Sequence, residues 1–177
     1  MKLVQAGDPA QLGMLFERHH LGLFRYLLHL SGNRALSEDL VQEVFFRALK
    51  YARSYDPSLS FAVWLYGMAR NAYFDALQKR RAEVSGEDLG EFRSPEPAAQ
   101  DAFARKQDAM FLQEALQQLP PEKREVLVLT RFHNMRHEDI ARLLRCEIGT
   151  VKVRVYRALK ELRERFCELR GERLYDV

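Results

Sequence analysis

Near the C-terminal end of the chain, three cationic side chains recur two and three residues apart: Lys152, Arg154 and Arg157. At about 100° per residue these positions share one arc of an α-helix, while Val151 and Val155 fall on the opposite arc. Lysine and arginine bind phosphates, arginine through a planar fork of donors. The pattern therefore predicts a helix with one face for a protein core and another for an anion. Its chemistry is recognition, not bond making.

Val153 stands in the middle of the cationic arc, where a merely solvated surface gains nothing from an apolar side chain. In a DNA major groove a thymine methyl group is a natural partner for such a residue. The alternative is an ordinary helical hairpin with a solvated, charged face. We interpret the arc as a DNA-binding surface. We call it the basic face, and it consists of Thr150, Lys152, Val153, Arg154, Tyr156 and Arg157.

The residues upstream supply the support that such a helix needs. A shorter apolar stripe over 140–144 follows Glu138 and Asp139, two acids that suit the first turn of a helix. Only residues 145–147 separate this stripe from the basic helix. Two short helices joined by a tight turn, the second of them basic, form the outline of a helix-turn-helix.

The first half of the chain predicts three helices, over about 8–31, 37–50 and 61–81. Asp8 and Ser37 are the expected N-caps of the first two, because their side chains accept hydrogen bonds from free backbone N–H groups. Between the second and third helices, a Tyr-Asp-Pro-Ser sequence breaks the periodicity and predicts a loop.

Phe46 falls on the polar half of the second helix, beside Asp39, Gln42 and Glu43. An aromatic residue there either docks a partner or packs under a loop, and periodicity alone does not separate the two. The third helix leaves an aromatic and basic surface that includes Arg70, Asn71, Lys79 and Arg80. Rings stack on unpaired bases while cations hold the backbone, so this surface suits single-stranded nucleic acid, as does Tyr55 at an expected loop tip.

The charge of the chain changes sharply in its middle. Residues 82–101 contain six acidic residues and one basic residue, with two glycines and two prolines, a composition typical of a linker. We therefore predict an all-α fold of two small helical domains joined by a flexible acidic linker, with the helix-turn-helix in the second domain. The expected parts are 1–81, 82–105 and 106–177.

Other functions are disfavoured by what the sequence lacks. It has neither an apolar signal region nor the ~20 apolar residues of a membrane span, so we expect a cytoplasmic protein without membrane insertion. His19, His20 and His29 have no companion ligands at suitable spacing, and the two cysteines lack CxxC spacing, so no metal or cofactor is expected. No carboxylate pair, nucleophile–base set or glycine-rich phosphate loop points to an enzyme.

The order of the motifs closely resembles the extracytoplasmic-function sigma factors, the smallest group of the bacterial sigma-70 family. The motifs are SEDLVQEVFFRAL, FAVWLYGMARNAYFD, LPPEKREVLVLTRF and HEDIARLLRCEIGTVKVRVYRALKEL. The resemblance covers nearly all of residues 8–165, with family regions 2 and 4 and the divergent linker between them. It implies a protein that is not an enzyme. Such a protein binds core RNA polymerase, directs it to promoter DNA as a monomer, helps melt the −10 element, and is controlled by an anti-sigma factor.

Carried over by position, the resemblance implies three sets of contacts. Docking on the polymerase falls to Asp39, Leu40, Gln42, Glu43 and Phe46. Reading of unpaired −10 bases falls to Tyr55 and Asn71, next to the basic residues Arg70, Lys79 and Arg80. Reading of the −35 element falls to the basic face. Two departures from the family pattern concern this last set, because Val153 replaces a common serine and Arg145 replaces the usual glycine of the turn.

Two other protein classes share parts of this pattern. A conventional helix-turn-helix regulator normally dimerises on a palindromic site, and it does not need a region-2-like domain over residues 8–81. A sigma mimic that only titrates an anti-sigma factor needs no basic recognition face, and the receiver domain typical of that class is absent. We therefore expect a sigma factor.

Overall fold

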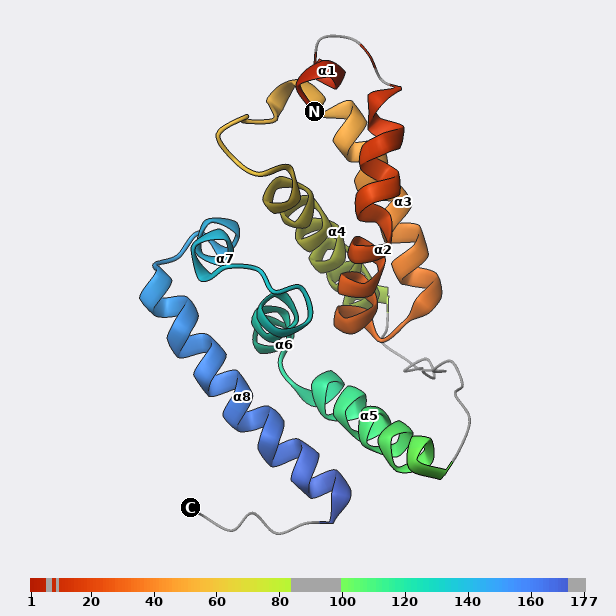
Figure 1. The fold of residues 1–177 in the computed structure, drawn as a ribbon, viewed down its shortest axis with the longest axis vertical. Helices are drawn as coiled ribbons and strands as arrows, with labels where there is room; N and C mark the ends of the chain where they lie inside the picture. The colour runs from red at the N-terminus through yellow and green to blue at the C-terminus, as the bar shows by residue number, and fades with distance from the viewer. Residues whose placement is uncertain (6–7, 9, 84–99, 172–177) are drawn as a thin grey trace. The chain divides into compact units, whose positions relative to one another are not determined.

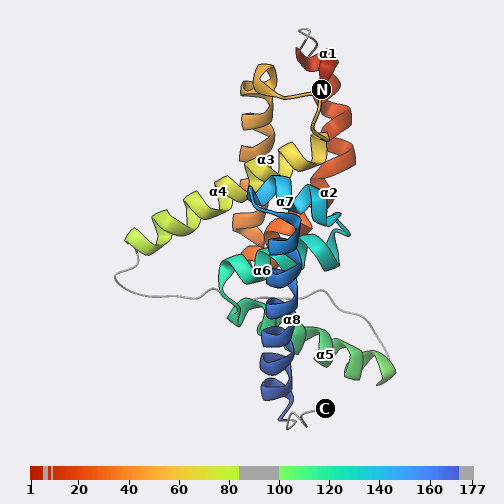
Figure 2. The ribbon, with the colours of Figure 1, turned by 90° about the vertical axis from the view of Figure 1, so that its left-hand side faces the viewer.

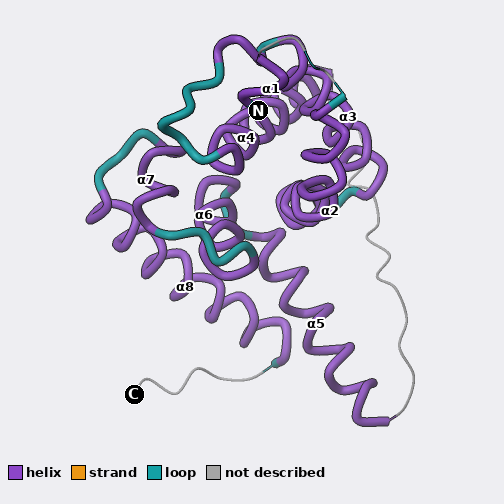
Figure 3. The backbone as a smooth tube through the Cα atoms, turned by 45° about the horizontal axis from the view of Figure 1, so that its top comes forward, coloured by secondary structure: helices purple, strands orange, loops and turns teal. Residues whose placement is uncertain are grey.

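The computed structural model describes residues 1–5, 8, 10–83 and 100–171 of the 177-residue chain. Throughout these residues the regular structure is helical, as Figures 1 and 3 show, so the predicted all-α class is confirmed. The chain divides into two compact units, one formed by the helices before the acidic stretch and one formed chiefly by those after it. None of the described helices combines the length and the apolar character needed to cross a membrane.

The first unit contains a short N-terminal helix, three long helices and a 3-10 turn: α1 (Lys2–Gln5), α2 (Gln11–Ser31), α3 (Arg34–Lys50), η1 (Ala52–Ser54) and α4 (Phe61–Glu83). The three long helices pack around a core whose fully buried side chains include Leu23, Tyr26, Leu27, Leu30, Val44 and Leu65. Burying each large aliphatic side chain stabilises the fold by roughly 1.5–3 kcal/mol. The C-terminal end of α4 projects past α2 and α3, which leaves Lys79 and Arg80 exposed (Figure 2).

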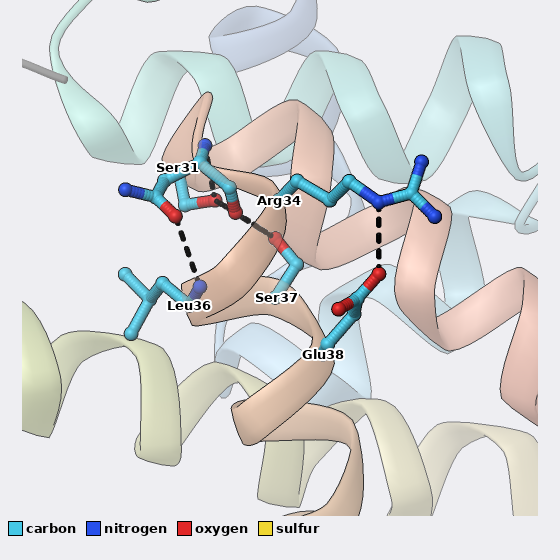
Figure 4. A network of polar contacts seen from close by, with 6 residues as sticks. Ser31, Arg34, Leu36, Ser37 and Glu38 are labelled. Atoms are coloured by element: carbon cyan, nitrogen blue, oxygen red, sulfur yellow. Dashed lines mark hydrogen bonds and ion pairs between the residues drawn. The ribbon is translucent and has the colours of Figure 1, made fainter. Parts of the chain in front are cut away.

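The junction between α2 and α3 differs from the sequence expectation in one respect. α2 ends as expected at Gly32, whose φ of 65° is the left-handed conformation that glycine adopts at little cost. α3 begins earlier than predicted, because Asn33 is its N-cap and accepts a hydrogen bond of 2.9 Å from the backbone N–H of Leu36 (Figure 4). Ser37 is therefore not the cap. It lies buried inside the helix, where its hydroxyl donates to the Asn33 carbonyl at 2.6 Å.

The N-terminal end of α2 also differs from the prediction. The helix begins at Gln11, and the Asp8 carboxylate accepts a hydrogen bond of 3.2 Å from the Ala10 backbone N–H, just outside the helix. Pro9, between Asp8 and Ala10, lies outside the described residues. α1, which precedes this start, was not predicted, since four residues are too few to show a helical period.

The predicted linker over 82–105 is helical at both of its described ends. α4 continues to Glu83, and the next helix begins at Gln100. Residues 84–99, which include most of the acidic stretch, lie outside the described residues. The linker and the domain boundaries therefore stay predictions.

The second unit is formed by α5 (Gln100–Gln118), α6 (Pro121–Leu127), the π-helical turn η2 (Val128–Phe132), residues 137–141 of α7 (His137–Leu144) and α8 (Ile148–Arg170). α8 packs against both α5 and α6. The buried core of this unit includes Leu116, Leu119, Leu127, Leu129, Ile140, Val151 and Ala158. Pro121 suits the first position of α6, because its ring presets a helical φ and its missing N–H is not needed there.

Arg124 is buried at the junction of α5 and α6. Its guanidinium donates to the side-chain amide oxygen of Gln117 at 2.5 Å and to the backbone carbonyl of Leu119 at 3.1 Å. It also donates to the Gln117 carbonyl. The last carbonyls of a helix lack partners within the helix and carry partial negative charge. A buried cation that caps them fixes α6 to the end of α5.

η2 is wider than an α-helical turn. The backbone N–H of His133 donates to the carbonyl of Val128, five residues earlier, at 3.2 Å. The Thr130 hydroxyl donates to the Val126 carbonyl at 2.6 Å, which gives that carbonyl a side-chain donor. The chain then reaches α7 through a connector in which Asn134 has a φ of 48°.

Candidate nucleic-acid interface

α7 and α8 are joined by a tight turn whose geometry caps the end of α7. The backbone N–H of Arg145 donates to the Arg142 carbonyl at 3.3 Å, and that of Cys146 donates to the Ala141 carbonyl at 3.0 Å. These two bonds, with Arg145 at a φ of 51°, form the Schellman motif that glycine usually closes. The predicted helix-turn-helix is thus present, with an arginine in the left-handed position.

The exposure of α8 follows the predicted division into two arcs. Val151, Val155 and Ala158 are buried on the inner side of the helix. The basic face lies outside, with Lys152, Arg154 and Arg157 exposed and Thr150 half-buried at the edge. Val153 is 48% exposed and Tyr156 is 72% exposed, so neither side chain serves the core. An apolar and an aromatic residue therefore stand in solvent among cations.

The cations of the basic face are not used to hold the fold together. Within the described part of the chain, Lys152, Arg154 and Arg157 form no ion pair or side-chain hydrogen bond. By contrast Glu161, the acid at the edge of this face, is bound by Lys123 of α6. Because the nearby acid is already neutralised, the positive charge of the basic face is available to an external anion.

The outer side of α3 carries a second exposed cluster, which we call the acidic face: Asp39, Gln42, Glu43 and Phe46. Phe46 is 67% exposed, so the alternative that it packs under a loop is wrong. Glu43 accepts from Arg47 at 2.5 Å, and Arg47 also reaches Asp75 of α4 at 3.5 Å. These ion pairs link the acidic face to the neighbouring helix.

Leu40 does not belong to this surface. It is 3% exposed and lies in the core of the first unit, so its side chain is not available for the docking contact that the family position implied. The physical reason is its place on α3, where Leu40 shares the inner side with Val44 and Ala48.

The residues expected to read −10 bases are divided between the surface and the interior. Asn71, Lys79 and Arg80 are exposed along α4. Arg70 is half-buried, and its guanidinium carbon lies 4.8 Å from the centre of the Phe74 ring, a cation–π contact. This contact orients the guanidinium over an aromatic surface.

Tyr55 is not at an exposed loop tip, which corrects the sequence expectation. It is 9% exposed, its hydroxyl donates to the Leu59 carbonyl at 2.6 Å, and its ring centre lies 5.2 Å from that of Trp64. Burial, with a smaller contribution from the neighbouring Asp56 charge, raises the pKa of Tyr55. The side chain is therefore an uncharged part of the framework under the loop over 55–60.

Asp56 is the charged residue of this loop, and its carboxylate is well satisfied. It accepts hydrogen bonds of 2.8 Å from both the backbone N–H and the hydroxyl of Ser58. Both bonds lower the pKa of Asp56, and the bond from the backbone N–H contributes the larger part. Elsewhere in the described chain, no group of three or more histidine, cysteine or carboxylate side chains is placed to hold a metal ion.

The fold and its exposed faces define a protein with a helix-turn-helix, whose second helix presents a basic face, and a further helical unit. Comparisons with protein families identify the class. Residues 15–83 match the family model of Sigma-70 region 2, and residues 111–162 match that of Sigma-70 region 4. The two matches fall in the first and second units respectively.

Known relatives support the same assignment. The chain is 35% identical over 161 residues to the RNA polymerase sigma factor CarQ of Myxococcus xanthus, covering 89% of this chain and 90% of that protein. It is 31% identical over 164 residues to the ECF RNA polymerase sigma factor SigE of Mycolicibacterium smegmatis, covering 89% of this chain and 63% of that protein.

A solved structure with the same fold is the sigma factor RpoE in complex with the anti-sigma factor NepR from Bartonella quintana. It has a TM-score of 0.71 and 24% identity, with 88% of this chain and 96% of that chain covered. CnrH in complex with the cytosolic domain of CnrY gives a TM-score of 0.70 at 23% identity, with 92% of each chain covered. The chain belongs to the sigma-70 family of transcription initiation factors and, within it, to the ECF RNA polymerase sigma factors.

Proposed function

We propose that this sigma factor binds core RNA polymerase through its first unit and directs it to promoters whose −10 and −35 elements are read by the first and second units respectively. The observation that supports this most strongly is the division of exposed functional side chains between the two units. The acidic face with Phe46 lies on α3, and the basic face lies on α8. Both are recognition surfaces, so the proposed role is not that of an enzyme.

The acidic face is the proposed docking surface for the polymerase. An exposed aromatic ring surrounded by charged and amide groups is the composition expected of an interface hot spot and its polar rim. Phe46 would fill an apolar recess, while Asp39 and Glu43 would face cationic groups of the polymerase. The ion pair between Glu43 and Arg47 holds the Glu43 carboxylate in place before binding.

The surface of α4 and the loop before it are the proposed site for the melted −10 element. The Asn71 amide can both donate to and accept from the edge of an unpaired base. Lys79 and Arg80 would hold the phosphate backbone, and Arg70 with Phe74 offers a surface on which a base can stack. Because Tyr55 is buried, its proposed role is to shape the loop that meets the base.

The basic face is the proposed reader of the −35 element. Lys152, Arg154 and Arg157 are free to contact phosphates and base edges, while Val153 would contact a thymine methyl group. Contacts to phosphates release counterions, so binding should weaken steeply as salt rises.

We further propose that an anti-sigma factor controls this protein, that it works in the cytoplasm with the polymerase, and that it binds the polymerase as a monomer. The similar folds of RpoE and CnrH were both solved with a partner, NepR and the cytosolic domain of CnrY respectively. An anti-sigma factor would act most directly by covering the acidic face or the basic face.

Run-off transcription with purified core polymerase on a genomic DNA library tests the proposal. The chain should direct transcription from a small set of promoters that share −35 and −10 sequences, and core polymerase alone should not. A protein that bound duplex DNA as a dimer without polymerase, and gave no transcripts, would be a conventional regulator, which contradicts the proposal.

A further inference from the structure

The short helix α1 precedes the family match, which begins at residue 15. Although it contains only four residues, it is tied to a distant part of the first unit. The side-chain amide of Gln5 donates a hydrogen bond of 2.9 Å to the backbone carbonyl of Tyr55, fifty residues further along the chain. Val4, next to it, is buried. α1 also packs against both η1 and α2.

The loop that follows Tyr55 has its own internal framework. The Tyr55 hydroxyl donates to the Leu59 carbonyl, so the ring spans the base of the loop. Asp56 and Ser58 form a second set of bonds at the tip, both of 2.8 Å. The Ser60 hydroxyl accepts from the Val63 backbone N–H at 3.2 Å and so caps the start of α4. These bonds fix the shape of the loop but do not fix its position on the unit.

The position of the loop depends on the backbone hydrogen bond of 3.2 Å from the Tyr55 N–H to the Ala52 carbonyl of η1, and on contacts from two further sides. From the α4 side, the rings of Trp64 and Phe61 pack against Tyr55, with ring centres 5.2 and 6.2 Å away respectively. From the other side, the Gln5 amide holds the carbonyl that joins Tyr55 to Asp56. The orientation of this peptide group sets the direction in which the exposed tip leaves the unit. Packing of rings tolerates sliding, whereas a hydrogen bond to one carbonyl defines the position of a single atom.

We propose that Gln5 is a positioning residue for the −10-reading loop, and that α1 is a functional part of the promoter-melting unit. The inference rests on the proposed function of the loop over 55–60. Gln5 would act through the Tyr55 carbonyl and would not touch DNA itself. Its loss should leave polymerase docking and −35 recognition unchanged, while the loop would meet the unpaired base in a less defined orientation.

Two substitutions of Gln5 distinguish the effect of losing the hydrogen-bond donor from the effect of adding a charge. Gln5→Met keeps the length of the side chain without a donor, and Gln5→Glu replaces the donor with a carboxylate facing the carbonyl. Gln11→Glu is the matched control, because its amide bonds only the exposed Asp8 carboxylate near the start of α2. The measurement is the rate of open-complex formation by holoenzyme on a duplex promoter identified by run-off transcription, compared with a template already melted at −10.

A typical intramolecular hydrogen bond corresponds to about a fivefold change in an equilibrium constant, so open-complex formation by Gln5→Met should fall about fivefold. The rate of open-complex formation by Gln5→Glu should fall further, and the rate for Gln11→Glu should match that of the wild type. The melted template should restore most of the activity, and affinities for core polymerase and for −35 DNA should be unchanged. Preference among bases at one −10 position should also weaken, an effect that a simple loss of stability would not produce.

Several outcomes would overturn the inference. They are an unchanged rate in Gln5→Met, a loss confined to Gln5→Glu, or a loss of polymerase binding in either variant. A lowered thermal midpoint with an equal loss on both templates would show that α1 only supports the fold. If the wild-type chain directs no transcription with core polymerase, the proposed function fails instead, so the two failures are distinguishable.

Discussion

The outer faces of α3 and α8 both carry charged residues around an exposed aromatic ring, yet their charges are arranged differently. On α3 two of the three acids are paired, since Arg34 bonds Glu38 at 2.9 Å and Arg47 bonds Glu43 at 2.5 Å, while Asp39 has no such partner among the described residues. On α8 the three cations of the basic face have no such partner among the described residues. Paired side chains present a surface that is ordered before binding, whereas unpaired cations can neutralise DNA phosphates and release the counterions condensed on the DNA. The comparison predicts that binding of polymerase depends on the shape of the acidic face and on the sign of its charge. Binding of DNA by the basic face should depend mainly on the salt concentration.

Reversing charge on the acidic face should have the largest effect. Asp39→Arg with Glu43→Arg places like charges against the cationic groups expected on the polymerase, which costs several kcal/mol at an interface. Affinity for core polymerase should fall by about a hundredfold or more, as measured by fluorescence titration. Thermal unfolding should change little, because both side chains are exposed and the ion pair of Glu43 with Arg47 that is lost is a surface pair, worth only about 0.3–0.5 kcal/mol. Glu17→Arg on α2 is the control for added charge, and undiminished core binding by the double variant would show that docking lies elsewhere.

Removing a cation from the basic face should have the next largest effect. Arg157→Ala should weaken promoter binding by holoenzyme by roughly 1–3 kcal/mol if Arg157 bonds a base, or lower the salt dependence by about one counterion if it bonds a phosphate. Titrations at two salt concentrations distinguish these cases. The stability of the free protein should not change, because Arg157 is unpaired.

Arg124→Ala is the contrasting variant. It removes a buried cation that caps α5, and it should destabilise the second unit by about 2 kcal/mol. If Arg157→Ala and Arg124→Ala lost the same stability, Arg157 would also support the fold, and the contrast between a DNA-binding cation and a structural cation would be wrong.

At the turn between α7 and α8 we expect a smaller effect, and it should be a gain of stability instead of a loss. A left-handed conformation costs an L-residue roughly 1–2 kcal/mol, and the greater freedom of glycine in the unfolded chain returns part of this. Arg145→Gly should therefore stabilise the second unit by about 0.5–1 kcal/mol, measured by urea unfolding. A destabilised variant would mean that the Arg145 side chain makes a compensating contact.

The smallest effect is expected at Val153, which is the sharpest test of how the basic face reads sequence. Val153→Ser restores the residue common in the family and removes the proposed contact with a thymine methyl group. It should alter the preferred base at one −35 position with little loss of total affinity. Binding across a library of −35 variants measures this, and an unchanged base preference would show that Val153 does not meet the DNA bases.

The elements that periodicity reveals best were predictable from the sequence. α8 has a strong division between apolar and cationic arcs, and its buried and exposed residues follow that division. The start of α3 was missed because Asn33 and Ser37 are both good caps, and the pattern alone does not choose between caps four residues apart. The burial of Tyr55 depends on Trp64 and Phe61, which meet it only after the chain folds.

One error came from the carry-over of a motif, and one contact was missed by every kind of sequence reasoning. Leu40 entered the docking set by its place in the family motif, although it is spaced four and eight residues from Val44 and Ala48, with which it is buried on the inner side of α3. The bond from Gln5 to Tyr55 left no signal that local reasoning detects, because a single glutamine near the N-terminus is ordinary in composition. Contacts between residues distant in sequence need the assembled fold.

The wide turn η2 determines which changes in chain length this fold accommodates. A π-helical turn contains one more residue than an α-helical turn, so it is structurally equivalent to a single inserted residue. A chain with one residue fewer between 128 and 132 could close an ordinary α-helical turn there and keep the direction in which α7 departs. A gap of two residues would instead rotate α7 relative to α6 and expose Ile140, which is fully buried. In an alignment of related chains, the expected length difference at this place is therefore one residue.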